Sequence, residues 1–311
     1  MTVQRFGLRV LQLGIFVLIV WLVYRRLAPE FRQLSSADLL RFRPSVSLLL
    51  LSTAILTGVN LMHAFLWRAI TVALTGATVS IRAAMRIFFV SSLGRYIPGK
   101  VWQLAGTAML AQSEGVSAMG ATSAALVGQL AFLTTGIGFL AVLLPGVFTG
   151  SAAWAAAGLV IMAVLLSVFA FTAAGRNLRN RVLERLGPRF VQGGALLDRL
   201  TVSSTLRYWT LYAVSWMLVA IAFDLLVMAF VPERDLRRSA AIVAASYVSG
   251  YISLLPAGAV VRESVMATLL APTVGAPAAV LISIISRLWF TAGEMLPLIA
   301  VPFFPRPGKA A

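Results

Sequence analysis

The chain contains no cysteine and a single histidine, His63, among its 311 residues. Without cysteine, disulfides, thiol catalysis and cysteine-ligated metals are excluded, and one histidine cannot build a histidine-rich metal site. Charged residues are also scarce, at 12% of the chain against 60% hydrophobic residues. A soluble domain carries about 25% charged residues. This composition excludes soluble, disordered and collagen-like proteins and predicts an all-α polytopic membrane protein.

Acidic residues are the scarcer charge, with 10 Asp and Glu against 26 Lys and Arg and a net charge of +16. Nucleic-acid binding is one reading of this excess. The basic residues, however, fall between apolar runs, which is the positive-inside pattern of membrane proteins, so we expect no nucleic-acid partner. The chain has no P-loop, paired-carboxylate motif or nucleophile elbow. We therefore expect no enzyme, no catalytic residue, no metal and no cofactor.

Six apolar runs are long enough to cross about 30 Å of hydrocarbon, which takes roughly 20 residues. The first lacks a small-residue cleavage site, which favours an uncleaved span over a signal peptide. The basic loop 173–206 is placed in the cytoplasm, which puts both termini there as well. Because the basic residues are nearly all arginine, as in GC-rich genomes, we expect a bacterial cytoplasmic (inner) membrane. The predicted spans are residues 8–24, 45–67, 119–144, 152–172, 207–230 and 277–302.

Two further apolar stretches, 81–112 and 240–270, are interrupted by glycine and proline. Each is either two short spans or a re-entrant pair of half-helices. The stretches resemble one another at nearly constant offset, and three full spans separate them, which predicts an inverted internal repeat of the transporter type. Chance similarity between membrane segments is the alternative. We interpret 1–311 as one membrane domain with repeat motifs at 81–130 and 240–294, in which Gly94 pairs with Gly250, Pro98 with Pro256 and Gly115 with Gly275.

The breaks at Pro98-Gly99 and at Pro256-Ala257-Gly258 need a protein-lined or wet environment, because hydrocarbon cannot satisfy free backbone groups. A half-helix that begins after a break points its N–H groups and positive dipole end at the break. Lys100 follows the first break and Arg262 follows the second. This pattern predicts an anion site, such as one for a lipid phosphate. The alternative is that both cations reach to the membrane surface as topology anchors.

Charges inside membrane segments are costly and often functional. Arg262 and Glu263 are adjacent and diverge by about 100° on a helix, so we expect Arg262 to find a partner elsewhere. Arg287 and Glu294 lie seven residues apart on the last span, and we expect both to face the second break, with an Arg287–Glu263 bridge. The alternative is a set of packing ion pairs. The predicted headgroup-binding residues are Arg95, Tyr96, Lys100, Gln103, Arg262, Glu263, Arg287 and Glu294.

Two polar residues inside other spans are predicted to be structural. Asp224, in AIAFDLLVM, either hydrogen-bonds across helices or pairs with an arginine. His63 is expected near the inner end of the second span, where a lone histidine usually supports packing.

The stretch 92–103, SLGRYIPGKVWQ, resembles the LGKYLPGKVWQ-type motif of the flippase-like membrane domain of lysylphosphatidylglycerol synthases. A second signature of that family is similar to residues 255–263, LPAGAVVRE, with Ala259 and Val260 where the family usually carries glycine near GGLGVRE. Arg287 in the last span also fits. The resemblance covers essentially the whole chain. It implies the stand-alone membrane part of such a protein, with no synthase domain.

The resemblance implies lipid translocation between leaflets, and the broken half-helices with their cations predict a cationic polar groove through which the headgroup crosses. The substrate is expected to be an anionic-phosphate or aminoacylated phospholipid, or a polyprenyl-phosphate-linked lipid, and membrane phospholipids or the lipid-linked substrate are the expected partners. One alternative is a non-transporting partner of an envelope lipid or glycan enzyme. Another is an intramembrane enzyme that acts on polyprenyl-phosphate lipids. The sequence does not fix the oligomeric state.

Overall fold

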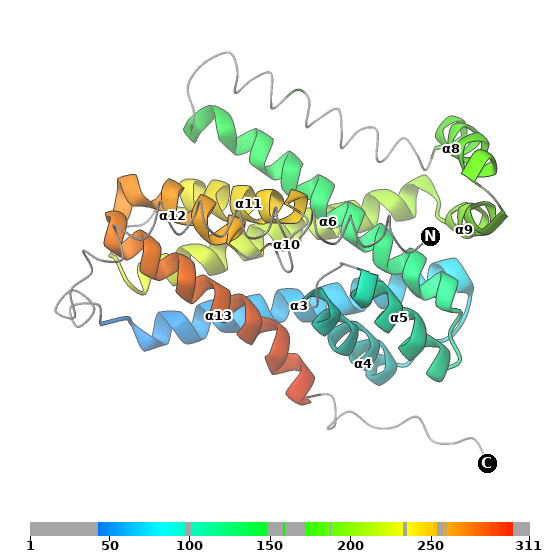
Figure 1. Ribbon diagram of the computed structural model, residues 1–311, viewed down its shortest axis with the longest axis horizontal. Coiled ribbons are helices and arrows are strands. Elements are labelled where there is room, and N and C mark those ends of the chain that lie inside the picture. The colour runs from blue at the N-terminus through cyan, green and yellow to red at the C-terminus, as the bar shows by residue number, and fades with distance from the viewer. Residues whose placement is uncertain are drawn as a thin grey trace, which may run out of the picture.

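A computed structural model describes residues 43–96, 101–147, 158, 172–186, 188–232, 235–253, 258 and 260–300. The elements in these ranges are helices, arranged as Figure 1 shows. The predicted span 8–24 and nearly all of 152–172 lie outside the described residues. The helices are α3 (Val46–Thr75), α4 (Ile81–Ser92), the short 3-10 helix η1 (Leu93–Tyr96), α5 (Val101–Ser113), α6 (Ala118–Val147), α8 (Ala173–Leu186), α9 (Pro188–Leu197), α10 (Val202–Met228), α11 (Leu236–Ile252), α12 (Val261–Val274) and α13 (Ala276–Ala300).

Four of these helices are long and apolar enough to cross a membrane: α3, α10, residues Ala118–Leu143 of α6 and residues Ala276–Ile299 of α13. They coincide with four predicted spans, so the all-α, multi-pass membrane fold is confirmed. The predicted second span stopped at the charge of Arg68, but α3 runs on to Thr75. The helix continues because arginine is a good helix former, and the Arg68 side chain donates a hydrogen bond to the Val79 carbonyl, beyond the end of α3.

The two interrupted stretches form pairs of short helices. Helices α4 and α5 have 12 and 13 residues, and α11 and α12 have 17 and 14. At 1.5 Å per residue they cover about 18–26 Å, less than the hydrocarbon thickness. Helix α4 packs on α5, and α11 packs on α12. These lengths favour re-entrant helical pairs over paired full spans.

The basic loop predicted at 173–206 is largely helical. Helices α8 and α9 occupy most of it, and the exposed side chains of α8 include Arg181 and Arg185. A spacing of arginines between leucines suits an amphipathic helix as well as it suits a loop, and charge counting alone does not separate the two.

Helix α3 packs on α10, α6, α13 and α4. One buried apolar cluster joins α3, α6 and α10 and includes Trp67 and Trp209. A second joins α10 to α11, α12 and α13 and includes Trp216 and Trp289. Phe132 of α6 packs against both clusters. The candidate site lies where the two clusters meet.

The same order of elements occurs twice: a short helix, a break, a second short helix, a glycine and a long helix. The first copy is α4, η1, α5 and α6, and the second is α11, α12 and α13. Gly115 and Gly275, which precede the long helices, both have positive φ angles, of 74° and 80°, a conformation that glycine adopts readily. Figure 1 places α4 and α5 toward one end of the long axis and α11 and α12 toward the other. This order supports the internal repeat. The inversion of the second copy relative to the first stays a prediction.

Candidate functional site

Two glycines bring the broken segments close to their own second helices. A Cβ atom on Gly94 would lie 2.6 Å from the backbone nitrogen of Gln103, so η1 rests directly on the first turn of α5. A Cβ atom on Gly250 would lie 2.2 Å from Cγ of Arg262, so the end of α11 rests on the first turn of α12. The pairing of Gly94 with Gly250 therefore corresponds to a shared role. Each allows the contact that places Gln103 or Arg262.

The second break contains strained backbone. Val260 has a φ angle of 73°, which is unusual for any residue other than glycine and is a clear outlier for a β-branched one. This is a position where the sequence departs from the glycine-rich pattern of the family it resembles. Such strain persists when the surroundings hold it in place and often lies at functional sites. Arg262 follows two residues later.

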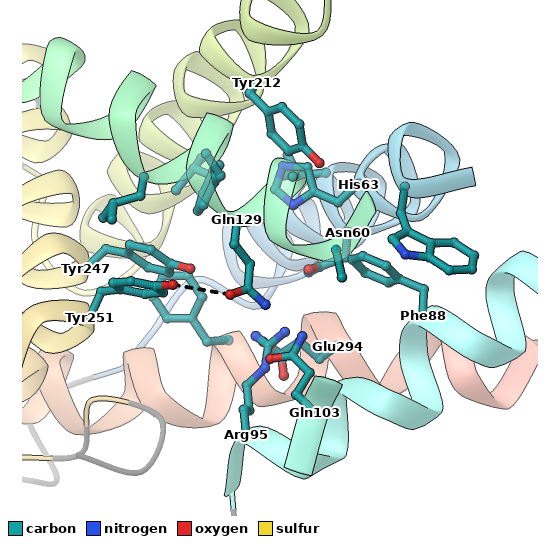
Figure 2. A pocket seen from close by; sticks show the side chains of 18 of the residues that line it. Asn60, His63, Phe88, Arg95, Gln103, Gln129, Tyr212, Tyr247, Tyr251 and Glu294 are labelled. Atoms are coloured by element: carbon teal, nitrogen blue, oxygen red, sulfur yellow. Dashed lines mark hydrogen bonds and ion pairs between the residues drawn. The ribbon is translucent and has the colours of Figure 1, made fainter. Parts of the chain in front are cut away.

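A cavity of about 120 Å³ lies between these breaks and the long helices. This volume holds several water molecules. His63, which lines it, lies near the middle of the 30-residue helix α3, so the cavity is about halfway along a spanning helix. Its uncharged polar lining, part of which Figure 2 shows, includes Asn60, His63, Gln103, Gln129, Tyr247 and Tyr251.

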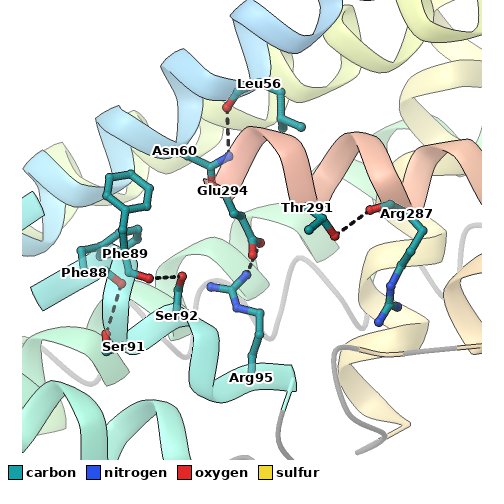
Figure 3. A network of polar contacts seen from close by, with 10 residues as sticks. All are labelled: Leu56, Asn60, Phe88, Phe89, Ser91, Ser92, Arg95, Arg287, Thr291 and Glu294. Atoms are coloured by element: carbon teal, nitrogen blue, oxygen red, sulfur yellow. Dashed lines mark hydrogen bonds and ion pairs between the residues drawn. The ribbon is translucent and has the colours of Figure 1, made fainter. Parts of the chain in front are cut away.

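An ion pair links the first break to the last helix. Nη1 of Arg95 lies 2.5 Å from Oε1 of Glu294, and the Glu294 residue is 8% exposed. Figure 3 shows this pair beside Ser92 and Thr291, whose hydroxyls donate to carbonyls of their own helices, those of Phe89 and Arg287. The sequence predicted that Glu294 would face the second break. Its ion pair is with the first, because the α13 helix packs on α4 as well as on α12.

A second ion pair links α12 to α13. Nη1 of Arg287 lies 3.1 Å from Oε1 of Glu263, so the predicted Arg287–Glu263 bridge is confirmed. Helix α13 thereby pairs with the first break through Glu294 and with the helix after the second break through Arg287. Asp224 accepts a hydrogen bond of 2.9 Å from Ser239 of α11, the cross-helix alternative for this residue.

Arg262 has aromatic neighbours in place of a carboxylate. Its guanidinium carbon lies 5.0 Å from the ring centre of Tyr247 and 4.2 Å from that of Phe290. Cations bind the faces of aromatic rings at such distances. Its Nη2 atom is buried without a hydrogen-bond partner, although the side chain lines the cavity. The expectation that Arg262 finds partners other than Glu263 is confirmed, and the partners are rings.

The described site has an excess of positive charge. The charged residues of the cavity wall are Arg95, Arg262 and Glu294, and the neighbouring Arg287 and Glu263 cancel each other. Three cations minus two anions leave +1. An anion with a single charge would neutralise the site and supply acceptors for the Arg262 guanidinium.

Of the remaining predicted site residues, some are described by the structure and others are not. Tyr96 ends η1, and Gly258 lies eight residues beyond Gly250, against which it packs. Lys100 lies outside the described residues, as do Pro98, Gly99 and Pro256.

His63 is placed differently from the prediction. Because α3 extends to Thr75, His63 lies within the helix rather than near its inner end, and its ring contacts Phe132 and Tyr212 at 4.8 and 5.2 Å. Its Nε2 lies 3.0 Å from Oγ of Ser215. Since Ser215 already donates to the Tyr212 carbonyl, Nε2 donates and Nδ1 is left as an acceptor. His63 is therefore part of the cavity wall.

Sequence reasoning missed several uncharged polar residues of the wall. Asn60 and Gln129 are amides in the middle of apolar spans, and Tyr247 and Tyr251 are one helical turn apart on α11. The Tyr251 hydroxyl donates to Oε1 of Gln129 at 3.2 Å. Polar residues inside apolar runs are a usable signal for such a wall, which charges and backbone breaks alone do not reveal.

We expect Glu294→Gln to lower the free energy of unfolding by about 1–2 kcal/mol. Breaking a fully buried pair costs about 3–5 kcal/mol, and the effect is smaller here because the Arg95 side chain is 31% exposed. Denaturation followed by tryptophan fluorescence in detergent measures it. The control is Glu114→Gln in the pair with Arg86, whose arginine is 49% exposed and whose loss should cost under about 1 kcal/mol. Equal effects of the two variants would contradict a structural role for the Arg95–Glu294 pair.

No curated protein matches the chain. A family model described as the lysylphosphatidylglycerol synthase TM region matches residues 9–292. This range includes both breaks, the cavity-lining residues from Asn60 to Phe290, and most of α13. The chain therefore belongs to the family of lysylphosphatidylglycerol synthase transmembrane regions.

Proposed function

We propose that this protein moves a phospholipid, or a polyprenyl-phosphate-linked lipid, between the two leaflets of the membrane, with the phosphate bound in the cavity. The observation that carries the proposal is Arg262, a cavity-lining cation held by two rings and, among the described residues, without a carboxylate partner. A guanidinium binds phosphate oxygens through parallel hydrogen bonds. Family membership adds support, because the family is named after the membrane region of a phospholipid-modifying enzyme.

The charge of the site suits this cargo. A lipid phosphodiester carries one negative charge, which offsets the excess of +1. A charged headgroup is costly to bring into hydrocarbon, and a polar cavity halfway along the spanning helices lowers that cost. The acyl chains then stay in the lipid phase while the headgroup crosses. Lys100, by its position after the first break, is proposed as a second phosphate-binding cation.

We assign no chemical step to the cavity. Glu294 is held by Arg95 and Glu263 by Arg287, so both carboxylates act as partners of arginines rather than as bases toward a ligand. The proposed role is that of a flippase rather than an enzyme. The proposed location is the cytoplasmic membrane of a bacterium, with both termini in the cytoplasm.

The direct test is leaflet exchange in liposomes. Purified full-length protein is reconstituted with labelled phosphatidylglycerol, lysylphosphatidylglycerol or an undecaprenyl-phosphate analogue, and the label left in the outer leaflet is quenched over time. We expect faster exchange of at least one of these lipids than in protein-free vesicles. Two variants separate transport at the cavity from leakage of the vesicles. Arg262→Gln changes a cavity-lining residue and should slow exchange, whereas Arg207→Gln lies outside the cavity and should not. No exchange of any lipid by folded protein would contradict transport and favour a scaffolding role.

A further inference from the structure

The cavity wall has more uncharged hydrogen-bonding groups than the protein itself uses. Among the described residues, the hydroxyls of Tyr247 and Tyr212 and the amide of Gln103 make no hydrogen bond to the protein although they line the cavity. None of these atoms is closed off from the cavity as a buried, unpartnered group. They are therefore available to a ligand.

Two other groups have unused capacity on the same wall. Gln129 accepts from Tyr251 through Oε1, and its Nε2 remains free to donate. His63 retains Nδ1 as an acceptor. Figure 2 shows the Tyr247 and Tyr251 hydroxyls near Gln129, with Gln103 beside Arg95. The rings of Tyr247 and Tyr251 are stacked, with centres 6.5 Å apart, which holds both hydroxyls on one side.

The wall is unsuited to a second positive charge. Among the described cavity-lining residues, Glu294 is the carboxylate, and Arg95 holds it. One face of the Tyr247 ring and one face of the Phe290 ring, which would otherwise attract an ammonium group, are occupied by the Arg262 guanidinium. An aminoacylated headgroup would add a cation beside two arginines, and like charges placed together oppose binding.

We propose that the headgroup recognised here is a hydroxyl-rich one, a polyol or sugar joined to the lipid through a single phosphodiester. The phosphate is held by Arg262, and the hydroxyls by Tyr247, Gln103 and their neighbours, since a hydroxyl both donates and accepts, as this mixed set of groups requires. This inference rests on the proposed function and narrows its substrate class. It favours a hydroxylated headgroup over an aminoacylated one.

The test measures binding separately from transport. Full-length protein in detergent is titrated with phosphatidylglycerol, phosphatidylinositol, lysylphosphatidylglycerol and phosphatidylethanol, and the complexes are counted by native mass spectrometry. Phosphatidylethanol is the matched ligand, with the same phosphodiester charge and no hydroxyl. We expect the hydroxylated lipids to bind more tightly than phosphatidylethanol and lysylphosphatidylglycerol. Soluble glycerophosphoglycerol, a phosphodiester with the same single charge, is included to separate a lipid from a free polyol phosphodiester as the ligand.

Three variants test the groups named. Tyr247→Phe keeps the ring under Arg262 and removes the hydroxyl, and Gln103→Met keeps the length of the side chain and removes the amide. Each should weaken phosphatidylglycerol or phosphatidylinositol binding about threefold to tenfold, the equivalent of one neutral hydrogen bond, and leave phosphatidylethanol unchanged. Tyr208→Phe is the control, because Tyr208 is buried outside the cavity.

The outcomes distinguish this inference from the proposed function. Equal binding of phosphatidylglycerol and phosphatidylethanol, or tighter binding of lysylphosphatidylglycerol, would overturn the hydroxyl preference even if lipids cross the bilayer. A preference for hydroxylated lipids that is lost in Tyr247→Phe would support the hydroxyl preference even if the protein exchanges no lipid. In that case only the proposed transport function would be refuted. Preferred binding of soluble glycerophosphoglycerol would support the headgroup chemistry and overturn a lipid as the ligand.

Discussion

Replacing Arg262 by glutamine is expected to slow exchange of phosphate lipids about tenfold to hundredfold. Hydrogen bonds to charged groups contribute about 1.5–3 kcal/mol, and each 1.4 kcal/mol corresponds to a factor of ten. Arg262 is suited to this role because its side chain lines the cavity and its guanidinium is held by the rings of Tyr247 and Phe290. The rate is measured by quenching of labelled lipid in liposomes at matched protein content.

Two further variants show whether the loss is specific. Arg207→Gln removes an exposed arginine that also lies over a tyrosine ring, that of Tyr208 at 5.3 Å, but outside the cavity, and it should exchange lipid like the wild type. Arg262→Lys keeps the charge but loses the flat, forked guanidinium, so an intermediate rate is expected. If Arg262→Gln exchanges lipid like the wild type, Arg262 does not bind the phosphate. The family assignment does not depend on this result.

Replacing Gly94 by alanine is expected to destabilise the protein by about 3 kcal/mol, the upper part of the usual range for overpacking. The added Cβ would lie 2.6 Å from two backbone atoms, the nitrogen of Gln103 and the carbonyl carbon of Trp102. A side chain could rotate away from such a contact, but backbone atoms require η1 and α5 to separate. Arg95 and Gln103 would shift with them, so exchange should fall together with stability.

The matched control is Gly58→Ala in the interior of α3. A Cβ atom there meets nothing within 4 Å, so the change should stabilise the helix by up to about 1 kcal/mol. Thermal unfolding in detergent compares the two variants, with size-exclusion profiles as the check on folding. If Gly94→Ala unfolds like the wild type, the close contact of η1 with α5 is wrong.

Much of the fold is determined by the sequence alone. Few charges and long apolar runs define an all-α membrane protein, because the cost of charge in hydrocarbon is set by composition over about 20 residues. The glycine and proline interruptions at 81–112 and 240–270 also indicate breaks, since both residues act on their local backbone. The Arg287–Glu263 bridge was predictable because only one short turn separates their helices.

Tertiary structure decided what the site contains. Arg95 and Glu294 are 199 residues apart in the chain, and Glu294 meets the first break because of the way α13 crosses α4. Arg262 is held by rings from α11 and α13, and amides such as Gln129 become cavity walls only when separate helices converge. Hydrophobicity and backbone preference are local properties that a sequence displays directly. The partner of a side chain depends on how helices cross, which the folded bundle alone determines.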